Sequence, residues 1–166
     1  MHSDDNGAIK IRPMTPKDRA IIADLIMSVE NFNSTEVECA LELIDIFLND
    51  PNQKDYYVVV AEDSSFEVHA YACYGPVPLT KGTYDLYWIA THPFARGRGF
   101  GQALMKHVEG KVEEKRGRLL AVETSAKKSY ESTIAFYRGL GYEEASRIKD
   151  FYDVGDDRLI FVKRFS

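Results

Sequence analysis

A segment rich in glycine and arginine, residues 91–102, stands between a strand pattern and a helix pattern. Residues 96–101 read Arg-Gly-Arg-Gly-Phe-Gly. Glycine lets the main chain approach a ligand closely, and the free N–H groups and dipole of a helix N-terminus attract an anion. The segment therefore predicts a binding site for a phosphate-bearing ligand, with a plain tight turn as the alternative interpretation.

The spacing of the glycines narrows the class of ligand. Gly97, Gly99 and Gly101 are two residues apart, unlike the Gly-x-Gly-x-x-Gly of a dinucleotide-binding turn. An oxidoreductase that binds NAD or a flavin is therefore disfavoured. No Gly-Lys-Ser/Thr follows, which excludes a P-loop. The pattern present is Arg-x-x-Gly-x-Gly, formed by Arg96, Gly99 and Gly101.

Length and composition indicate an ordinary globular chain. It has 166 residues, 45% hydrophobic and 28% charged, with a net charge of −5. We expect a flexible terminus at residues 1–7 and a single domain at residues 8–166. The negative charge argues against a nucleic-acid or membrane-surface binder. The two cysteines and four histidines lack ligand spacing, which predicts no metal site and favours a cytoplasmic location.

Apolar periodicity and turn residues predict the elements that position this segment. Strands are expected at residues 9–12, 56–61, 67–74, 84–91, 119–125, 147–152 and 158–164, and helices at residues 16–29, 34–50, 99–115 and 129–140. We expect Ser34 or Thr35 to cap the second helix. Because hairpins come early and late in this order, the fold class is predicted to be α/β (α+β) with a partly parallel sheet.

A second motif follows about 35 residues after the first, where residues 133–142 read TIAFYRGLGY. With the Arg-x-x-Gly-x-Gly pattern and the element order, the chain resembles the GNAT superfamily of acyl-CoA-dependent N-acetyltransferases over roughly residues 8–165. The resemblance implies a mixed sheet of about seven strands with a splayed parallel pair, flanked by about four helices. It also implies acetyl-CoA as cofactor and a primary amine as acceptor: a small metabolite, an amino acid or a protein N-terminus. A homodimer is compatible with it.

The resemblance assigns the cofactor to two segments. Main-chain amides of residues 96–102 would hold the pyrophosphate, and the strand edge before them would bind the pantetheine arm. Tyr130 replaces an Asn that often binds this arm, so Ser132 or a backbone group is expected to substitute. The predicted cofactor-binding residues are Ile89, Ala90, Thr91, Arg96, Gly97, Arg98, Gly99, Phe100, Gly101, Gln102 and Ser132. As alternatives, Arg98 is a surface charge and Ile89 a core residue.

The same resemblance supplies candidate catalytic residues. Tyr137 matches the general acid that protonates the CoA thiolate, with a packed aromatic residue as the alternative. Glu123 and Asp85 match base positions in two branches of the superfamily, and a water chain is a third possibility. His92, next to Pro93, is interpreted as a loop residue.

The acceptor side is suggested by charge alone. Tyr152, Asp156 and Glu30 are placed to attract a cationic amine, unless Asp156 is a satisfied turn carboxylate. Direct attack of the amine within a ternary complex requires no covalent enzyme intermediate. A non-catalytic domain that binds acyl-CoA as a sensor or scaffold remains the alternative function.

Overall fold

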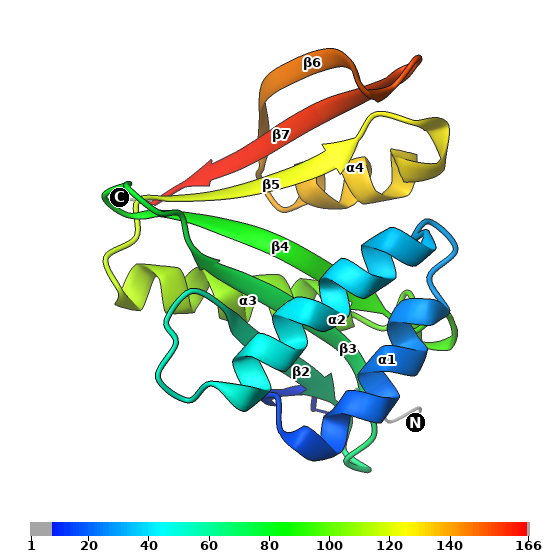
Figure 1. Ribbon diagram of the computed structural model, residues 1–166, viewed down its shortest axis with the longest axis vertical. Coiled ribbons are helices and arrows are strands. Elements are labelled where there is room, and N and C mark those ends of the chain that lie inside the picture. The colour runs from blue at the N-terminus through cyan, green and yellow to red at the C-terminus, as the bar shows by residue number, and fades with distance from the viewer. Residues whose placement is uncertain (1–7, 166) are drawn as a thin grey trace, which may run out of the picture. The chain divides into compact units, whose positions relative to one another are not determined.

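The computed structural model describes residues 8–165 (Figure 1). The predicted flexible terminus, residues 1–7, lies outside the described residues. The elements are β1 (Lys10–Pro13), α1 (Arg19–Met27), α2 (Ser34–Asn49), β2 (Tyr57–Glu62), β3 (Val68–Pro76), β4 (Thr83–Thr91), α3 (Phe100–Glu114), β5 (Leu119–Ser125), α4 (Glu131–Gly139), β6 (Glu143–Asp153) and β7 (Asp156–Arg164). Their order is the predicted one. Short 3-10 turns precede α1, α3 and α4 at Pro16–Asp18, Pro93–Ala95 and Lys128–Tyr130.

The described strands form one seven-stranded sheet in the order β1-β2-β3-β4-β5-β7-β6. β4 and β5 run parallel, whereas β1 and β2, β5 and β7, and β6 and β7 pair antiparallel. The parallel register ends at the pair Leu86 and Val122, although β4 continues to Thr91 and β5 to Ser125. The mixed sheet and its splayed parallel pair are thus confirmed.

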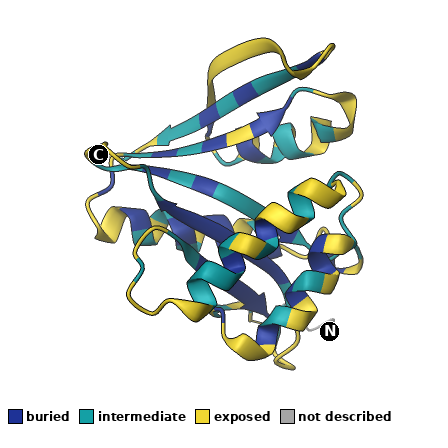
Figure 2. Ribbon diagram, viewed as in Figure 1, coloured by how far each residue is buried: buried dark blue, intermediate teal, exposed yellow. Residues whose placement is uncertain are grey.

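The chain divides into two compact units, which are described separately. The first contains residues up to 73 together with residues 88–107, and the second contains residues 74–87 and those from 108 onward. In the first unit the core contains apolar side chains from α1, α2, β2, β3, the end of β4 and the start of α3. Figure 2 shows β2 and β3 buried along most of their length. No helix among the described residues combines the length and apolar character needed to cross a bilayer.

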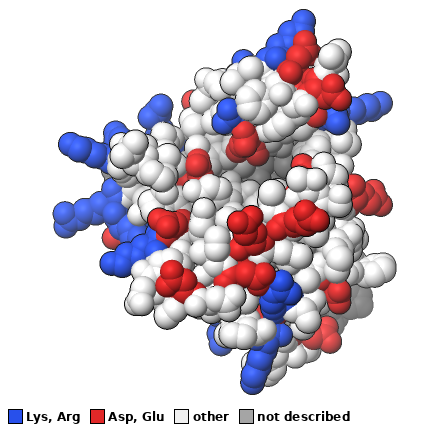
Figure 3. Space-filling model, viewed as in Figure 1, with Lys and Arg blue, Asp and Glu red and all other residues white. Residues whose placement is uncertain are grey.

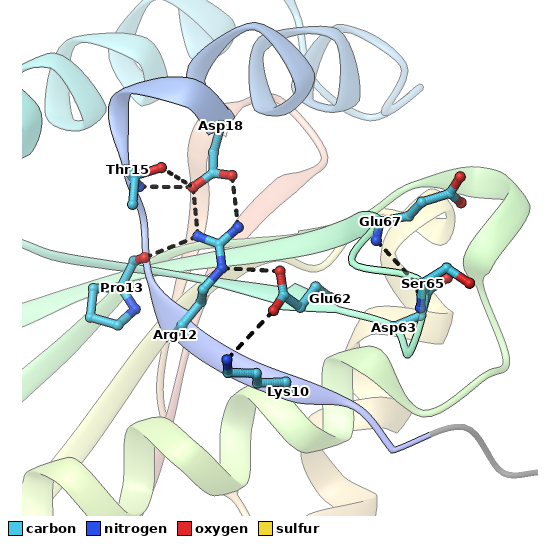
Figure 4. Close-up of polar contacts among 9 residues, drawn as sticks. All are labelled: Lys10, Arg12, Pro13, Thr15, Asp18, Glu62, Asp63, Ser65 and Glu67. Carbon is cyan, nitrogen blue, oxygen red and sulfur yellow. Dashed lines mark hydrogen bonds and ion pairs between the residues drawn. The ribbon is translucent and has the colours of Figure 1, made fainter.

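An ion-pair network joins β1, the turn before α1, and β2 in the first unit (Figure 4). Arg12 donates to both oxygens of Asp18 at 2.8 and 2.9 Å and to Glu62 at 3.0 Å. Asp18 also accepts from the Thr15 main-chain N–H at 2.8 Å, which closes the helix start that Thr15 and Pro16 predict. The Arg12 hydrogen bond holds the pKa of the buried Asp18 carboxyl below its ordinary value. Burial of these acids is tolerated because each is paired with Arg12.

The core of the second unit lies between α4 and one face of β5 and β7. Leu120, Val122, Leu159 and Phe161 are buried there. The edge strand β6 is exposed throughout (Figure 2). It begins at Glu143, four residues before the predicted start at residue 147. The sequence missed these residues because polar residues on an exposed edge strand show no apolar alternation.

Two other local predictions need correction. Asn33, not Ser34 or Thr35, caps α2: its side chain accepts from the Glu36 main-chain N–H at 2.9 Å, and Glu36 accepts from Asn33 N–H at 2.8 Å. Asp156 is the buried first residue of β7, which therefore begins two residues before the predicted start at residue 158.

Two glycines of the second unit allow a matched stability test. A Cβ on Gly117 would lie 2.3 Å from Val112 Cγ1 and 2.9 Å from Val112 O, whereas one on Gly110, within α3, would meet nothing within 4 Å. We expect Gly117→Ala to lower the free energy of unfolding by about 1–3 kcal/mol through overpacking. Gly110→Ala should raise it by up to about 1 kcal/mol. Urea denaturation measures both changes, and equal stability of the two variants would contradict this packing.

Candidate functional site

The glycine turn, residues 92–99, connects β4 to α3 in the first unit. Gly97 and Gly99 have φ angles of +77° and +88°, the left-handed region that favours glycine. A Cβ on Gly97 would meet nothing within 4 Å, and one on Gly99 only Ile9 Cδ1 at 3.9 Å. Backbone conformation rather than crowding therefore selects glycine, and the space above the main chain is open.

The first turn of α3 adds main-chain donors to the glycine turn. The amide of Ala103 donates to Gly99 O at 3.0 Å, which is the first hydrogen bond of the helical pattern. The amides of residues 100–102 precede it, where an α-helix offers no acceptor of its own. Arg96 and Arg98 are exposed beside them. The arrangement can bind an anion through N–H groups, the helix dipole and two guanidinium groups.

The other predicted cofactor-binding residues differ in exposure. Ile89 and Thr91 on β4 are partly exposed, and Ala90 between them is buried. The Phe100 side chain is also buried, so only its main chain is available to a ligand. Gln102 and Ser132 are exposed, the latter in the first turn of α4 within the second unit, and Gly101 is partly exposed. Their roles toward a cofactor stay predictions.

The two candidate bases lie on the same face of the sheet in the second unit. Asp85 pairs with Ala121 across the parallel ladder, and Glu123 is two residues further along β5. Side chains two residues apart on a strand point to the same face. Ser125, two residues after Glu123 on β5, pairs with Arg158 of β7. Arg158 therefore lies on this face as well. Arg158 Nε forms an ion pair with Glu123 Oε1.

Charge and burial distinguish Asp85 from Glu123. Burial, followed by the negative charge of Glu123, raises the pKa of Asp85 above its ordinary value of 3.8, and the positive charge of Arg158 opposes this shift. Burial and the charge of Glu123 likewise raise the pKa of Tyr152 to about 12, and Tyr152 is hydrogen-bonded to Glu123. Glu123 is thus engaged by a cation and a phenol. Asp85 is the carboxylate whose pKa is raised by burial.

Tyr137 lies against the opposite face of this part of the sheet. Its ring is 6.2 Å from that of Phe161, which pairs with Val122, and 5.9 Å from that of Tyr142. Neighbouring residues of a strand face opposite ways, so Phe161 and Val122 point away from the face of Glu123. The structure brings Asp85 and Glu123 together but does not place Tyr137 among them. Burial raises the pKa of Tyr137, so its hydroxyl stays protonated near neutral pH.

Sequence reasoning missed the contribution of Arg158. Its guanidinium carbon lies 4.9 Å from the ring centroid of Phe151, so it contacts an aromatic ring and a carboxylate at once. The available signal was a charged residue on a strand face that also carries Ile160 and Val162. Its pairing with Glu123 depends on the register of β5 and β7, which no local pattern reveals.

Asp156 is a satisfied carboxylate. It accepts from Ser125 Oγ at 2.5 Å and pairs with Lys127 Nζ at 3.2 Å. This agrees with the alternative interpretation of that residue, and its charge is neutralised locally. His92 lies between β4 and the 3-10 turn, where its Nδ1 accepts from the Phe94 N–H at 3.3 Å, as expected of a loop residue.

Known proteins are similar to this chain both in sequence and in structure. Residues 54–144 match the family model described as an acetyltransferase (GNAT) domain. A GNAT-family protein from Desulfovibrio desulfuricans is 37% identical with a TM-score of 0.89, and the match covers 95% of this chain and 99% of that one. The chain belongs to the GNAT acetyltransferase family. Its cofactor is accordingly acetyl-CoA.

More distant structures share the GNAT fold. The ribosomal-protein-S18-alanine N-acetyltransferase of Escherichia coli is 20% identical with a TM-score of 0.75, covering 96% of this chain and 95% of that one. The Salmonella typhimurium protein yncA, whose structure contains its cofactor acetyl-CoA, is 16% identical with a TM-score of 0.69, covering 96% and 95%. None of the curated proteins matches the sequence.

The glycine turn of this GNAT protein fits the diphosphate of CoA. Two left-handed glycines leave the space above their main chain open, and two exposed arginines flank that space. In the second unit, β5 residues 123–125 have no partner in the β4 register. These features match what a nucleotide thioester requires: donors for its phosphates and an unpaired strand edge for its amide groups.

Proposed function

We propose that the protein is an N-acetyltransferase that moves the acetyl group of acetyl-CoA to a primary amine. The acceptor is a small metabolite, an amino acid or a protein N-terminus. The observation that carries this proposal is the half-buried Asp85, whose proton affinity is raised beside Glu123 on the face where the parallel ladder ends. A carboxylate tuned in this way suits removal of a proton from an ammonium group.

Cofactor binding is assigned mainly to the first unit. Main-chain amides of residues 96–102, with Arg96 and Arg98, would hold the diphosphate. The edge of β4 at Ile89–Thr91 would bind the pantetheine arm, and Ser132 on α4 would supply a further contact. Bound acetyl-CoA supplies an activated acetyl thioester. The protein's part is to hold and orient that group, so that an amine attacks it directly.

Proton transfer is assigned to the second unit. Asp85 is the proton acceptor for the amine, since it is the less neutralised of the two carboxylates. Glu123 raises the proton affinity of Asp85 through its charge, and Arg158 limits that effect. Tyr137 is the proton donor for the departing thiolate, because burial keeps its phenol protonated.

A cationic acceptor is supported by surface charge. Glu38, Glu42 and Asp45 lie along one side of α2 around a shallow depression, and Figure 3 shows carboxylates gathered over this helix. Asp45 is paired with Arg19 at 2.6 and 2.9 Å, so Glu38 and Glu42 are the exposed carboxylates there. Carboxylates exposed in this way raise the local concentration of ammonium groups. The name of the Escherichia coli relative adds protein N-termini to the amines worth testing.

The remaining assignments follow from the same proposal. Residues 8–166 act as a single catalytic domain, with a homodimer as one possible assembly. Both cysteines are unpaired, Cys39 exposed and Cys73 buried, which suits a reducing cytoplasm.

Gly99→Glu tests the diphosphate site. The substitution places a negative charge beside the phosphates, so we expect at least about a tenfold loss of CoA affinity by isothermal titration calorimetry. Gly141→Glu is the matched control: Gly141 follows α4 with φ +89°, and a Cβ there would meet nothing within 4 Å. It carries the same backbone strain and the same charge change. Equal affinity losses in the two variants would refute the assignment.

The pH profile of kcat/KM tests the proton acceptor. Asp85 must be ionised to accept a proton, so activity should fall as pH drops through a pKa that lies above 3.8. Glu123→Gln removes a charge that raises this pKa, so the acid limb should move to lower pH. Arg158→Gln removes a charge that lowers it, so the limb should move to higher pH. One amine is used throughout, so its own titration is common to all variants. Shifts in the same direction, or an acid limb retained by Asp85→Asn, would exclude Asp85.

Turnover itself is tested by thiol release from acetyl-CoA across a panel of primary amines. With an amine that is acetylated, Tyr137→Phe should lower kcat by about 10²-fold or more while CoA affinity changes little. Tyr142→Phe is the control: its hydroxyl donates to Glu109 at 3.0 Å in the same aromatic cluster. That variant should lose stability rather than turnover. CoA binding without turnover of any amine would favour a sensor or scaffold.

A further inference from the structure

His69, on β3, contacts both ends of the glycine turn. Its carbonyl oxygen accepts a hydrogen bond from the His92 N–H at 2.8 Å, where the turn begins. Its imidazole ring lies 5.0 Å from the ring of Phe100, the first residue after the turn. His69 therefore contacts the residues at both ends of the glycine turn, His92 and Phe100.

The imidazole of His69 is itself fixed by the hairpin between β2 and β3. Its Nε2 lies 2.8 Å from Asp63 Oδ2. The other oxygen of Asp63 accepts from the N–H groups of Ser65 at 2.8 Å and Glu67 at 3.1 Å (Figure 4). The hydrogen bond with His69 lowers the pKa of Asp63, so this carboxylate stays ionised. The orientation of the ring is thus set by a tight turn outside the candidate site.

The Phe100 ring transmits this placement to an exposed cation. Arg98 Cζ lies 5.1 Å from the ring centroid of Phe100, within the range of a cation–π contact. The Phe100 ring is buried, whereas Arg98 is exposed. A ring that moved away from His69 would therefore take the support of the Arg98 guanidinium with it.

We propose that His69, held by Asp63, is a positioning residue for the diphosphate of acetyl-CoA. It fixes the two ends of the glycine turn and, through Phe100, the place of the Arg98 guanidinium. The inference rests on the proposed assignment of the diphosphate to the glycine turn. Because the His69 ring contacts Phe100 at the end of that turn, its effect should be confined to ligands that carry the diphosphate.

The test compares two ligands by isothermal titration calorimetry: CoA, and pantetheine, which lacks the nucleotide and both phosphates. We expect His69→Ala to weaken CoA binding about fivefold, the size of a lost aromatic contact, and to leave pantetheine affinity unchanged. His69→Phe keeps a ring against Phe100 but loses the hydrogen bond to Asp63, so it should bind CoA more tightly than His69→Ala and more weakly than wild type. Glu67→Gln is the control, because Glu67 is 73% exposed and lies 3.9 Å from His69. It should change neither affinity.

Each other outcome has a definite meaning. Equal losses for CoA and pantetheine in His69→Ala would overturn the proposal, since they would show general destabilisation. No loss for CoA, or a folded His69→Phe that binds as weakly as His69→Ala, would overturn it as well. A wild-type protein that binds CoA no more tightly than pantetheine would instead refute the diphosphate assignment. Thermal unfolding of each variant establishes that it is folded.

Discussion

The end of the parallel ladder after Leu86 and Val122 is the constraint on which the candidate site depends. Beyond this pair, β5 continues for three residues with β7 as its partner on one side only. Main-chain polar groups at such an edge need partners, which a ligand with amide groups can supply. The end of the ladder also marks the position of both carboxylates. Asp85 directly precedes Leu86, the last paired residue of β4, and Glu123 directly follows Val122, the last paired residue of β5. The end of strand pairing and the placement of the two carboxylates therefore originate in one feature of the sheet.

Local sequence patterns predicted the elements and the glycine turn. The order of the elements and the bounds of β5 depend on residues within a few positions of one another, and the structure confirms them. The positive φ angles of Gly97 and Gly99 are a detail that the structure adds. The splayed pair followed from the resemblance to GNAT proteins rather than from the residues themselves. Asn33 was missed because three consecutive polar residues compete for one cap, and only the geometry of the capping box decides among them.

Contacts between distant segments were beyond sequence reasoning. Arg158 reaches Glu123 because β5 and β7 align Ser125 with Arg158, a register set by the whole hairpin. Asp156 was open to two interpretations until Ser125 and Lys127 were seen to satisfy it. Phe100 lies in the middle of a functional motif, yet its side chain serves the core. A sequence motif thus predicts the main-chain conformation more securely than it predicts the role of each side chain.

The exposed strand β6 ends the sheet and bears on strand-to-strand pairing between molecules. Its register with β7 shifts twice, between Glu144 and Ser146 and between Ile148 and Asp153, and Asp150 has a φ of +53°. Irregular hydrogen-bond spacing and charged side chains make a poor template for a strand from another molecule. This edge strand is therefore disfavoured as a starting point for amyloid-like stacking of strands.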